Sequence, residues 1–215
     1  WREEQVMKVT KIVVLLFCIA LLAGCAARST NDPALKLSWA AEEFGWKEDP
    51  IAAEELLQDS LQIYRKQMNR LGLAETYRQY GLFLRSNAVT KLKEHYQREG
   101  FLDETIRYNT RYEKALEYFN KSREIFAEQN NAGMLSNVYL SMAKTYALMD
   151  KVPESCENLD KGRRSYASAK GVKAEAREVG VDEAENYEAY ITLMQKQMGC
   201  PLEMTAGIAL DSRGR

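Results

Sequence analysis

The chain has 215 residues, of which 46% are apolar and 28% charged, and its formal net charge at pH 7 is -1. This composition excludes a wholly disordered protein, and the balanced charge argues against the basic surface that nucleic-acid binding needs. The single histidine leaves little room for histidine-based catalysis or for a multi-histidine metal site. Four cysteines stand at positions 18, 25, 156 and 200, without the CxxC spacing of zinc or redox motifs.

The N-terminus has the layout of a secretory signal. Lys8 and Lys11 precede an unbroken apolar run, residues 12–23, which is shorter than the roughly 20 residues that a membrane span takes. The run ends in Leu-Ala-Gly-Cys at positions 22–25, which resembles the lipobox of bacterial lipoprotein precursors. This resemblance implies cleavage before Cys25 and lipidation of Cys25, with palmitate-type acyl chains. The alternative is an ordinary signal peptide in which this cysteine is coincidental.

The lipobox also divides the N-terminal region. We interpret Met7 as the start of translation, so that residues 1–24 comprise an untranslated leader and the signal peptide. Residues 25–32 are small and polar and are expected to form a lipidated tether. Ala26 stands where lipoproteins retained at the inner membrane carry Asp. In a bacterium with two membranes, the resemblance therefore implies a lipid-anchored protein on the periplasmic face of the outer membrane.

From position 32 to 198 the apolar residues recur at the three- and four-residue spacing of helices. Three helical hairpins align along this stretch, with small or apolar residues at matching positions. In the first helices these are Ala40-Ala41 with Phe44, Tyr80-Gly81 with Leu84, and Met142-Ala143 with Tyr146. In the second helices they are Ala53/Leu57/Ser60, Ala115/Phe119/Ser122 and Ser155/Leu159/Gly162. The offset is 40 residues both from Ala41 to Gly81 and from Ala115 to Ser155.

This pattern resembles the tetratricopeptide repeat family in its longer form, with about 40 residues per repeat. The resemblance implies an all-α solenoid of helical hairpins, at residues 33–67, 73–129 and 134–169. Members of the family bind peptides or partner domains in a groove lined by the first helix of each hairpin. Carried onto this register, the partner-binding residues are Ser38, Glu42, Trp46, Glu75, Arg78, Leu82, Arg85, Asn137, Leu140 and Lys144. The alternative is an irregular helical bundle whose small residues recur by chance.

The middle hairpin is longer than the others. Gly81 and Ala115 are 34 residues apart, whereas the matching residues of the other two hairpins are 12 apart. The excess is twice eleven residues, and eleven residues make three helical turns, so each helix can lengthen without rotating its apolar face. We therefore predict an elongated hairpin with helices at 73–99 and 103–129, projecting about 16 Å beyond the solenoid. An ordinary loop or a small extra helix is the alternative.

The C-terminal part of the chain favours a capping helix at residues 182–198, followed by a flexible tail at 199–215. If the last hairpin helix runs on and turns near Gly180, antiparallel packing brings Cys156 and Cys200 to the same end. Export would place them in a compartment where disulfides persist, so a bond that pins the cap is expected. The alternative is two free buried thiols.

No nucleophile motif, metal spacing or phosphate loop is present in the sequence, and neighbouring carboxylates such as Glu54 and Glu55 point to different faces of a helix. We therefore expect no enzyme, cofactor or metal. The leading hypothesis is a membrane-anchored scaffold that binds a protein partner in the cell envelope. The alternative is a structural subunit that oligomerises through the long hairpin at 88–109. A binding protein for small molecules has only Trp46 and the arginines of the groove in its favour.

Overall fold

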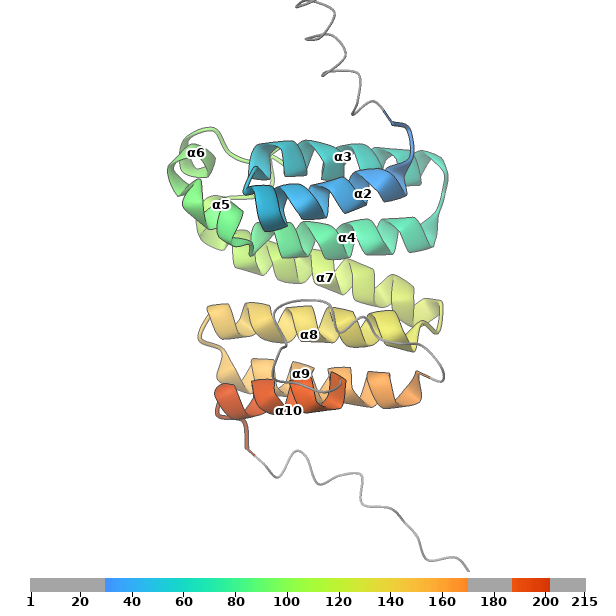
Figure 1. The fold of residues 1–215 in the computed structure, drawn as a ribbon, viewed down its shortest axis with the longest axis vertical. Coiled ribbons are helices and arrows are strands. Elements are labelled where there is room, and N and C mark those ends of the chain that lie inside the picture. Colours follow the sequence, from blue (N-terminus) through green and yellow to red (C-terminus); the bar gives the residue numbers. More distant parts are fainter. Residues whose placement is uncertain (1–29, 170–186, 202–215) are drawn as a thin grey trace, which may run out of the picture. The chain divides into compact units, whose positions relative to one another are not determined.

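The computed structural model describes residues 30–169 and 187–201, and within these ranges every secondary-structure element is helical (Figure 1). The predicted signal peptide, Cys25 and most of the tether lie outside the described residues. So do the start of the predicted cap and the tail from residue 202. The described helices belong to one unit that begins at Pro33.

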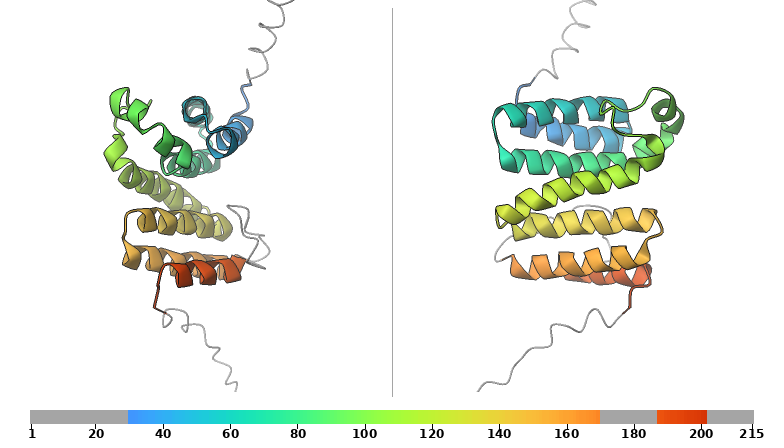
Figure 2. Two further views of the ribbon diagram at one scale, coloured as in Figure 1. Left: turned by 60° about the vertical axis from the view of Figure 1, so that its left-hand side comes forward. Right: turned by 180° about the vertical axis from the view of Figure 1, so that it is seen from behind.

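Most of the helices form three antiparallel pairs, which stack in chain order. The pairs are α2 (Pro33–Glu42) with α3 (Pro50–Lys66), α4 (Arg70–Leu84) with α7 (Arg111–Glu128), and α8 (Ala132–Leu148) with α9 (Val152–Ser168). α2 continues into the π-helix η1 (Glu43–Lys47) before the turn to α3. Between pairs, α3 packs on α4 and α7 packs on α8, and both views of Figure 2 show the same order. The last helix, α10 (Tyr187–Gln197), packs on α9.

The small and apolar residues that align in the second helices are all buried. Ala53, Ala115 and Ser155 begin the pattern in α3, α7 and α9, and none of them is exposed to solvent. Gly81 of α4 shows why the position must be small. A Cβ atom built on Gly81 would lie 2.6 Å from the Phe119 ring of α7, closer than side chains pack. Small residues therefore let the two helices of a pair approach closely, as the sequence pattern indicates.

Three connections between consecutive helices use the same tight turn. Each has a residue with a positive φ angle, Met68 (52°), Asn130 (53°) or Asp150 (58°), directly after the C-cap residue of the helix. The N–H of the following residue then donates to a carbonyl five residues earlier, for example from Asn69 to Tyr64 at 3.0 Å. This arrangement satisfies carbonyls at the helix end, and Asn69 and Asn131 then cap the next helix through their side chains.

The elongated middle hairpin predicted from the sequence is wrong. α4 ends at Leu84, and the connecting segment (residues 85–110) contains two short helices, α5 (Asn87–Lys91) and α6 (Lys93–Arg98), and a 3-10 turn, η2 (Tyr108–Thr110). Ser86 breaks the predicted helix, because its side chain accepts a hydrogen bond from the N–H of Val89 and starts a new helix there. The segment folds back beside the first pair, where α5 packs against η1.

Burial explains why the connecting segment folds back. Tyr96 and Phe101 stack with ring centroids 4.2 Å apart, and the Phe83 ring of α4 meets both of them edge-on. Ile106 is 0% exposed. On a projecting hairpin these residues could pack only against each other, whereas in the folded-back position they join the main core and lose more apolar surface to water.

Candidate functional site

The predicted partner-binding residues of the first pair lie together on one exposed face. Ser38 and Glu42 are exposed on α2, and Trp46 follows one turn later in η1. Trp46 is 88% exposed, the most exposed of the large apolar side chains that the structure describes. An exposed tryptophan keeps a large apolar surface in water, and tryptophan is enriched at binding interfaces. Among the described residues, this face therefore exposes a large apolar side chain beside two polar ones.

The predicted residues of α4, and Arg85 directly after it, adjoin this face, because α2 packs on α4. Arg78 and Glu75 form an ion pair, with Arg78 Nη2 and Glu75 Oε1 2.8 Å apart, and little of the Arg78 side chain remains exposed. Leu82 and Arg85 are half-buried, and Leu82 packs against the main core. In the α4 part of the predicted groove, the Arg78 guanidinium is therefore already paired with Glu75, and only part of the Leu82 side chain is exposed.

The predicted residues of α8 do not join the others. α7 lies between α4 and α8 in the stack, so Asn137, Leu140 and Lys144 are separated from the residues of α2 and α4 (Figure 1). Leu140 is only 4% exposed and belongs to a second core cluster with Tyr190 and Ile191 of α10. The Lys144 ammonium lies 5.2 Å from the centre of the Tyr190 ring. Leu140 and Lys144 are therefore contacts of α10 in this structure.

A disulfide between Cys156 and Cys200 holds the chain beyond α10 to α9. The Cα atoms of the two residues are 5.6 Å apart, although 44 positions separate them in the sequence. The Tyr187 ring at the other end of α10 stacks on Tyr166, with centroids 4.5 Å apart, and its hydroxyl bonds to Ser136. α10 is thus attached to the last pair at both of its ends.

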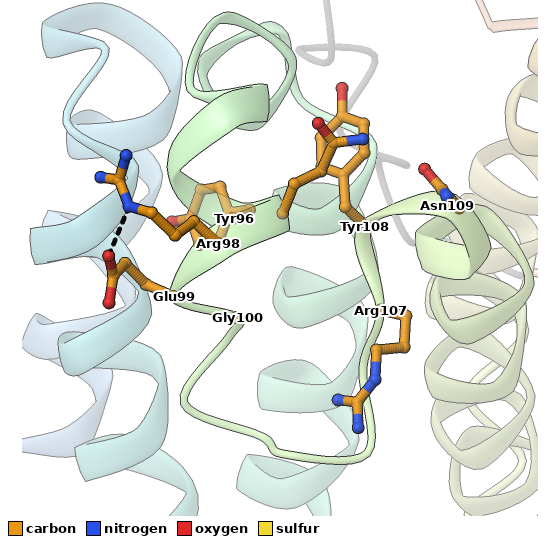
Figure 3. A pocket seen from close by; sticks show the side chains of 8 residues that line it. Tyr96, Arg98, Glu99, Gly100, Arg107, Tyr108 and Asn109 are labelled. Carbon is orange, nitrogen blue, oxygen red and sulfur yellow. Dashed lines mark hydrogen bonds and ion pairs between the residues drawn. The ribbon is translucent and has the colours of Figure 1, made fainter.

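The connecting segment, whose fold the sequence did not predict, forms a pocket of about 310 Å³. Figure 3 shows Arg98 and Glu99 paired on one side of it and Arg107 across from them, with Tyr108 and Asn109 beyond. Arg107 donates hydrogen bonds to the backbone carbonyls of Glu104 and Ile106. The pocket is open and polar, and nothing in its geometry resembles a nucleophile with its base.

Behind this segment lies a buried polar network centred on Glu54 of α3. The Glu54 Oε1 atom accepts hydrogen bonds from the Tyr80 hydroxyl at 2.8 Å and from the Leu102 N–H at 2.9 Å. The Tyr80 ring stacks on Tyr118, with centroids 4.6 Å apart, and the Tyr118 hydroxyl donates to Asp103 at 2.7 Å. The network therefore ties the connecting segment to α3, α4 and α7.

Burial raises the pKa of Glu54 to about 7, even though the hydrogen bonds from Tyr80 and Leu102 favour the charged form. The pKa of Tyr80 is raised as well, first by burial and then by the Glu54 charge. Burial alone would raise the pKa of Asp103, but hydrogen bonds from Thr105 and Tyr118 outweigh it and hold the pKa below its usual value. Glu54 is therefore a carboxyl group that titrates near neutral pH.

The stability of the fold should fall as the pH rises from about 4.5 to above 7. Because its folded-state pKa is raised, Glu54 binds its proton more tightly in the folded chain. Its contribution is complete below the unfolded-state pKa of 4.5 and is lost as the pH rises through about 7. The expected loss is up to about 3 kcal/mol of unfolding free energy. Denaturant unfolding at pH 5 and pH 8 measures it.

Two variants isolate this effect. Glu54→Gln keeps an acceptor for Tyr80 and Leu102 but cannot titrate, so the stability difference between the two pH values should shrink. Glu104→Gln removes an exposed carboxylate from the same segment and should leave the difference unchanged. An equal pH dependence in both variants would show that Glu54 is not its source.

No family model, curated protein or solved structure matches this chain. Within residues 30–169 and 187–201, no helix is long and apolar enough to cross a membrane. In the same ranges, no three side chains of His, Cys, Asp or Glu gather as a metal site would require. What the structure establishes is an all-helical protein of stacked helix pairs, with an exposed face on α2 and η1 and two pockets beside the connecting segment.

Glu54 is partly recognisable from the sequence. Neighbouring positions on a helix point to different faces, and of Glu54 and Glu55 the first is only 2% exposed while the second is exposed. The partners of Glu54 could not be foreseen, because Leu102 reaches it only through the fold-back of the connecting segment.

Proposed function

We propose that this chain is a lipid-anchored scaffold of a bacterial cell envelope that binds a protein partner on the exposed face of α2 and η1. The proposal joins the lipobox-like sequence at 22–25 to the exposed Trp46. The lipid on Cys25 would place the folded unit at a membrane surface. The observation that carries the partner-binding part is the nearly complete exposure of Trp46 beside Ser38 and Glu42.

Three features support a tetratricopeptide-like solenoid as the finer description of the fold. The aligned small residues of the second helices are buried, the same turn recurs after α3, α7 and α8, and the pairs stack in chain order. Two features depart from a regular solenoid, namely the connecting segment and the position of α7 between α4 and α8. The groove we propose is therefore confined to α2, η1 and α4, with α10 in the role of the C-terminal cap.

Site-specific photo-crosslinking in the native host tests the proposal. A photoreactive residue at Trp46 should give a discrete covalent adduct with a partner protein, because the side chain lies in the proposed interface. The matched control is Met68, which is 84% exposed on the turn between α3 and α4 and should give no adduct. Equal adducts from both positions, or none from Trp46, would contradict the partner-binding face.

The same experiment tests the lipid anchor when the cells are fractionated. The adduct formed at Trp46 should be found with membranes, and Cys25→Ser should remove the acyl label from the chain. An unchanged acyl label in Cys25→Ser would contradict the anchor without affecting the partner-binding face.

The alternative function, oligomerisation through the long hairpin at 88–109, depended on a projecting tip. The folded-back connecting segment removes that projection, since Tyr96, Phe101 and Ile106 are buried against the same chain. No other described feature favours the structural subunit over the scaffold.

A further inference from the structure

A second pocket, of about 170 Å³, lies between α3 and the connecting segment. It has an acidic part, an aromatic part and an apolar rim. Its lining residues are Glu54, Glu55 and Glu99, then His95, Tyr96, Gly100 and Phe101, and at the rim the exposed side chains of Ile51 and Leu102. This pocket is separate from the face of α2 and η1 proposed above to bind a protein.

The charge of the pocket favours a cation. Three carboxyl groups line it against a single imidazole, while Arg98 and Arg107 line the neighbouring pocket instead. Glu99 is paired with Arg98, whereas Glu54 is nearly buried and is ionised at a pH above its raised pKa of about 7. A buried carboxylate interacts with a cation more strongly than an exposed one, because less water screens the pair.

An unpartnered hydroxyl is the second, independent sign of a ligand. Tyr96 is 3% exposed, and its Oη atom has no hydrogen-bond partner among the described residues. Figure 3 shows this hydroxyl on the side of the ring that faces the pale blue helices of the first pair. Burial, and after it the charges of Glu54 and Asp49, raise the pKa of Tyr96. Both carboxylates belong to α3 or its N-cap, which agrees with a hydroxyl that points toward the first pair. A buried hydroxyl without a protein partner is costly, and a ligand that donates a hydrogen bond to it would offset this cost.

The remaining surfaces of the pocket suit an aliphatic chain. The stacked rings of Tyr96 and Phe101 form one wall. Ile51 (43% exposed) and Leu102 (55% exposed) present apolar atoms at the rim. A ligand with a charged head and a methylene stem would contact both kinds of surface, as lysine side chains do at protein surfaces.

We propose that this pocket binds a primary alkylammonium group, with the ammonium between Glu54 and Tyr96 and the methylene stem against Ile51 and Leu102. An ammonium carries three N–H donors and no acceptor. It can donate to the Glu54 carboxyl group and to the Tyr96 hydroxyl oxygen at the same time, and the aromatic walls favour its charge further. A free alkylamine and a lysine side chain of another protein share this chemistry.

Nuclear magnetic resonance on the full-length chain, with the glutamate carboxyl carbons labelled, tests the proposal. Titration with n-butylammonium or with Nα-acetyl-lysine amide should give a saturable shift of the Glu54 signal. Titration with n-butanol should give none, since the alcohol has the stem without the charge. Binding of both ammonium compounds would show that head and stem suffice, and binding of the lysine derivative alone would identify a peptide side chain as the source.

Four variants separate binding from folding. Glu54→Gln removes the carboxylate charge and Tyr96→Phe removes the hydroxyl that contact the ammonium. Each should weaken binding about tenfold, measured through the carboxyl signal of Glu99, which lines the same pocket and is present in both variants. Glu55→Gln changes an exposed lining residue that makes no contact within the core, so it should weaken binding without a loss of stability. Glu104→Gln, outside the pocket, should bind as the wild type does. No saturable shift with either ammonium compound, or an equal shift with n-butanol, would overturn the proposal.

Discussion

Replacement of both Cys156 and Cys200 with serine is expected to lower the free energy of unfolding of the last helix pair with α10 by about 4 kcal/mol, the chain-entropy contribution for a loop closed over 44 positions. The remaining contacts of α10 are the Tyr187 stack on Tyr166, the Lys144 ammonium over Tyr190, and the apolar cluster around Ile191. Without the covalent link these contacts must order α10 by themselves, so it should detach before the rest of the protein unfolds.

Amide hydrogen exchange measures this result residue by residue. Protection should fall along α10 and in the part of α8 around Leu140, which α10 covers, while α3 and α4 keep theirs. Adding a dithiol reductant to the wild type should reproduce the pattern of the double variant, and adding it to the double variant should change nothing. Unchanged protection of Leu140 in both experiments would contradict a stabilising role of the disulfide.

Gly81→Ala should destabilise the protein by about 1–3 kcal/mol, because the added Cβ atom would lie 2.6 Å from a ring carbon of Phe119. Both residues are buried between α4 and α7, so the ring cannot move into solvent. The two helices must separate or Phe119 must adopt a strained rotamer. Chemical denaturation of the variant and the wild type under identical conditions gives the difference.

The matched control is Gly45→Ala in the π-helix η1, where, apart from its chain neighbours and the nearby helix backbone, no described atom lies within 4 Å of the new Cβ position. Alanine restricts the unfolded chain more than glycine, so this variant should be as stable as the wild type or slightly more stable. Phe119→Leu should recover part of the loss when combined with Gly81→Ala, since the double variant relieves the contact. Equal effects of the two glycine substitutions would show that the close approach of α4 and α7 is not the cause.

The connecting segment shows where inference from the sequence failed. Eleven added residues preserve the face of an isolated helix, and that arithmetic led to two long helices at 73–99 and 103–129. The prediction of two long helices took no account of the apolar Phe83 ring or of the buried Glu54 carboxyl group. Both lie next to the connecting segment in the folded protein. The partners that decided the conformation are distant in sequence, so local periodicity could not reveal them.

The turns show a smaller failure. Met68, Asn130 and Asp150 adopt the positive φ angles that usually favour glycine, so the sequence carries only a weak signal for these positions. The same reversal recurs after α3, α7 and α8, each time between two helices that pack against each other.

The sequence by itself determined the helical class, the three pairs of antiparallel helices and the small residues at their contacts. These properties depend on the spacing of apolar and small residues along a single helix, a local pattern that the chain displays directly. Only the tertiary structure decided that the connecting segment folds back, that α10 covers Leu140, and that Glu54 and Tyr96 share a pocket. Each of these is a contact between residues far apart in the chain, selected by the burial of apolar surface and the pairing of buried polar groups across helices.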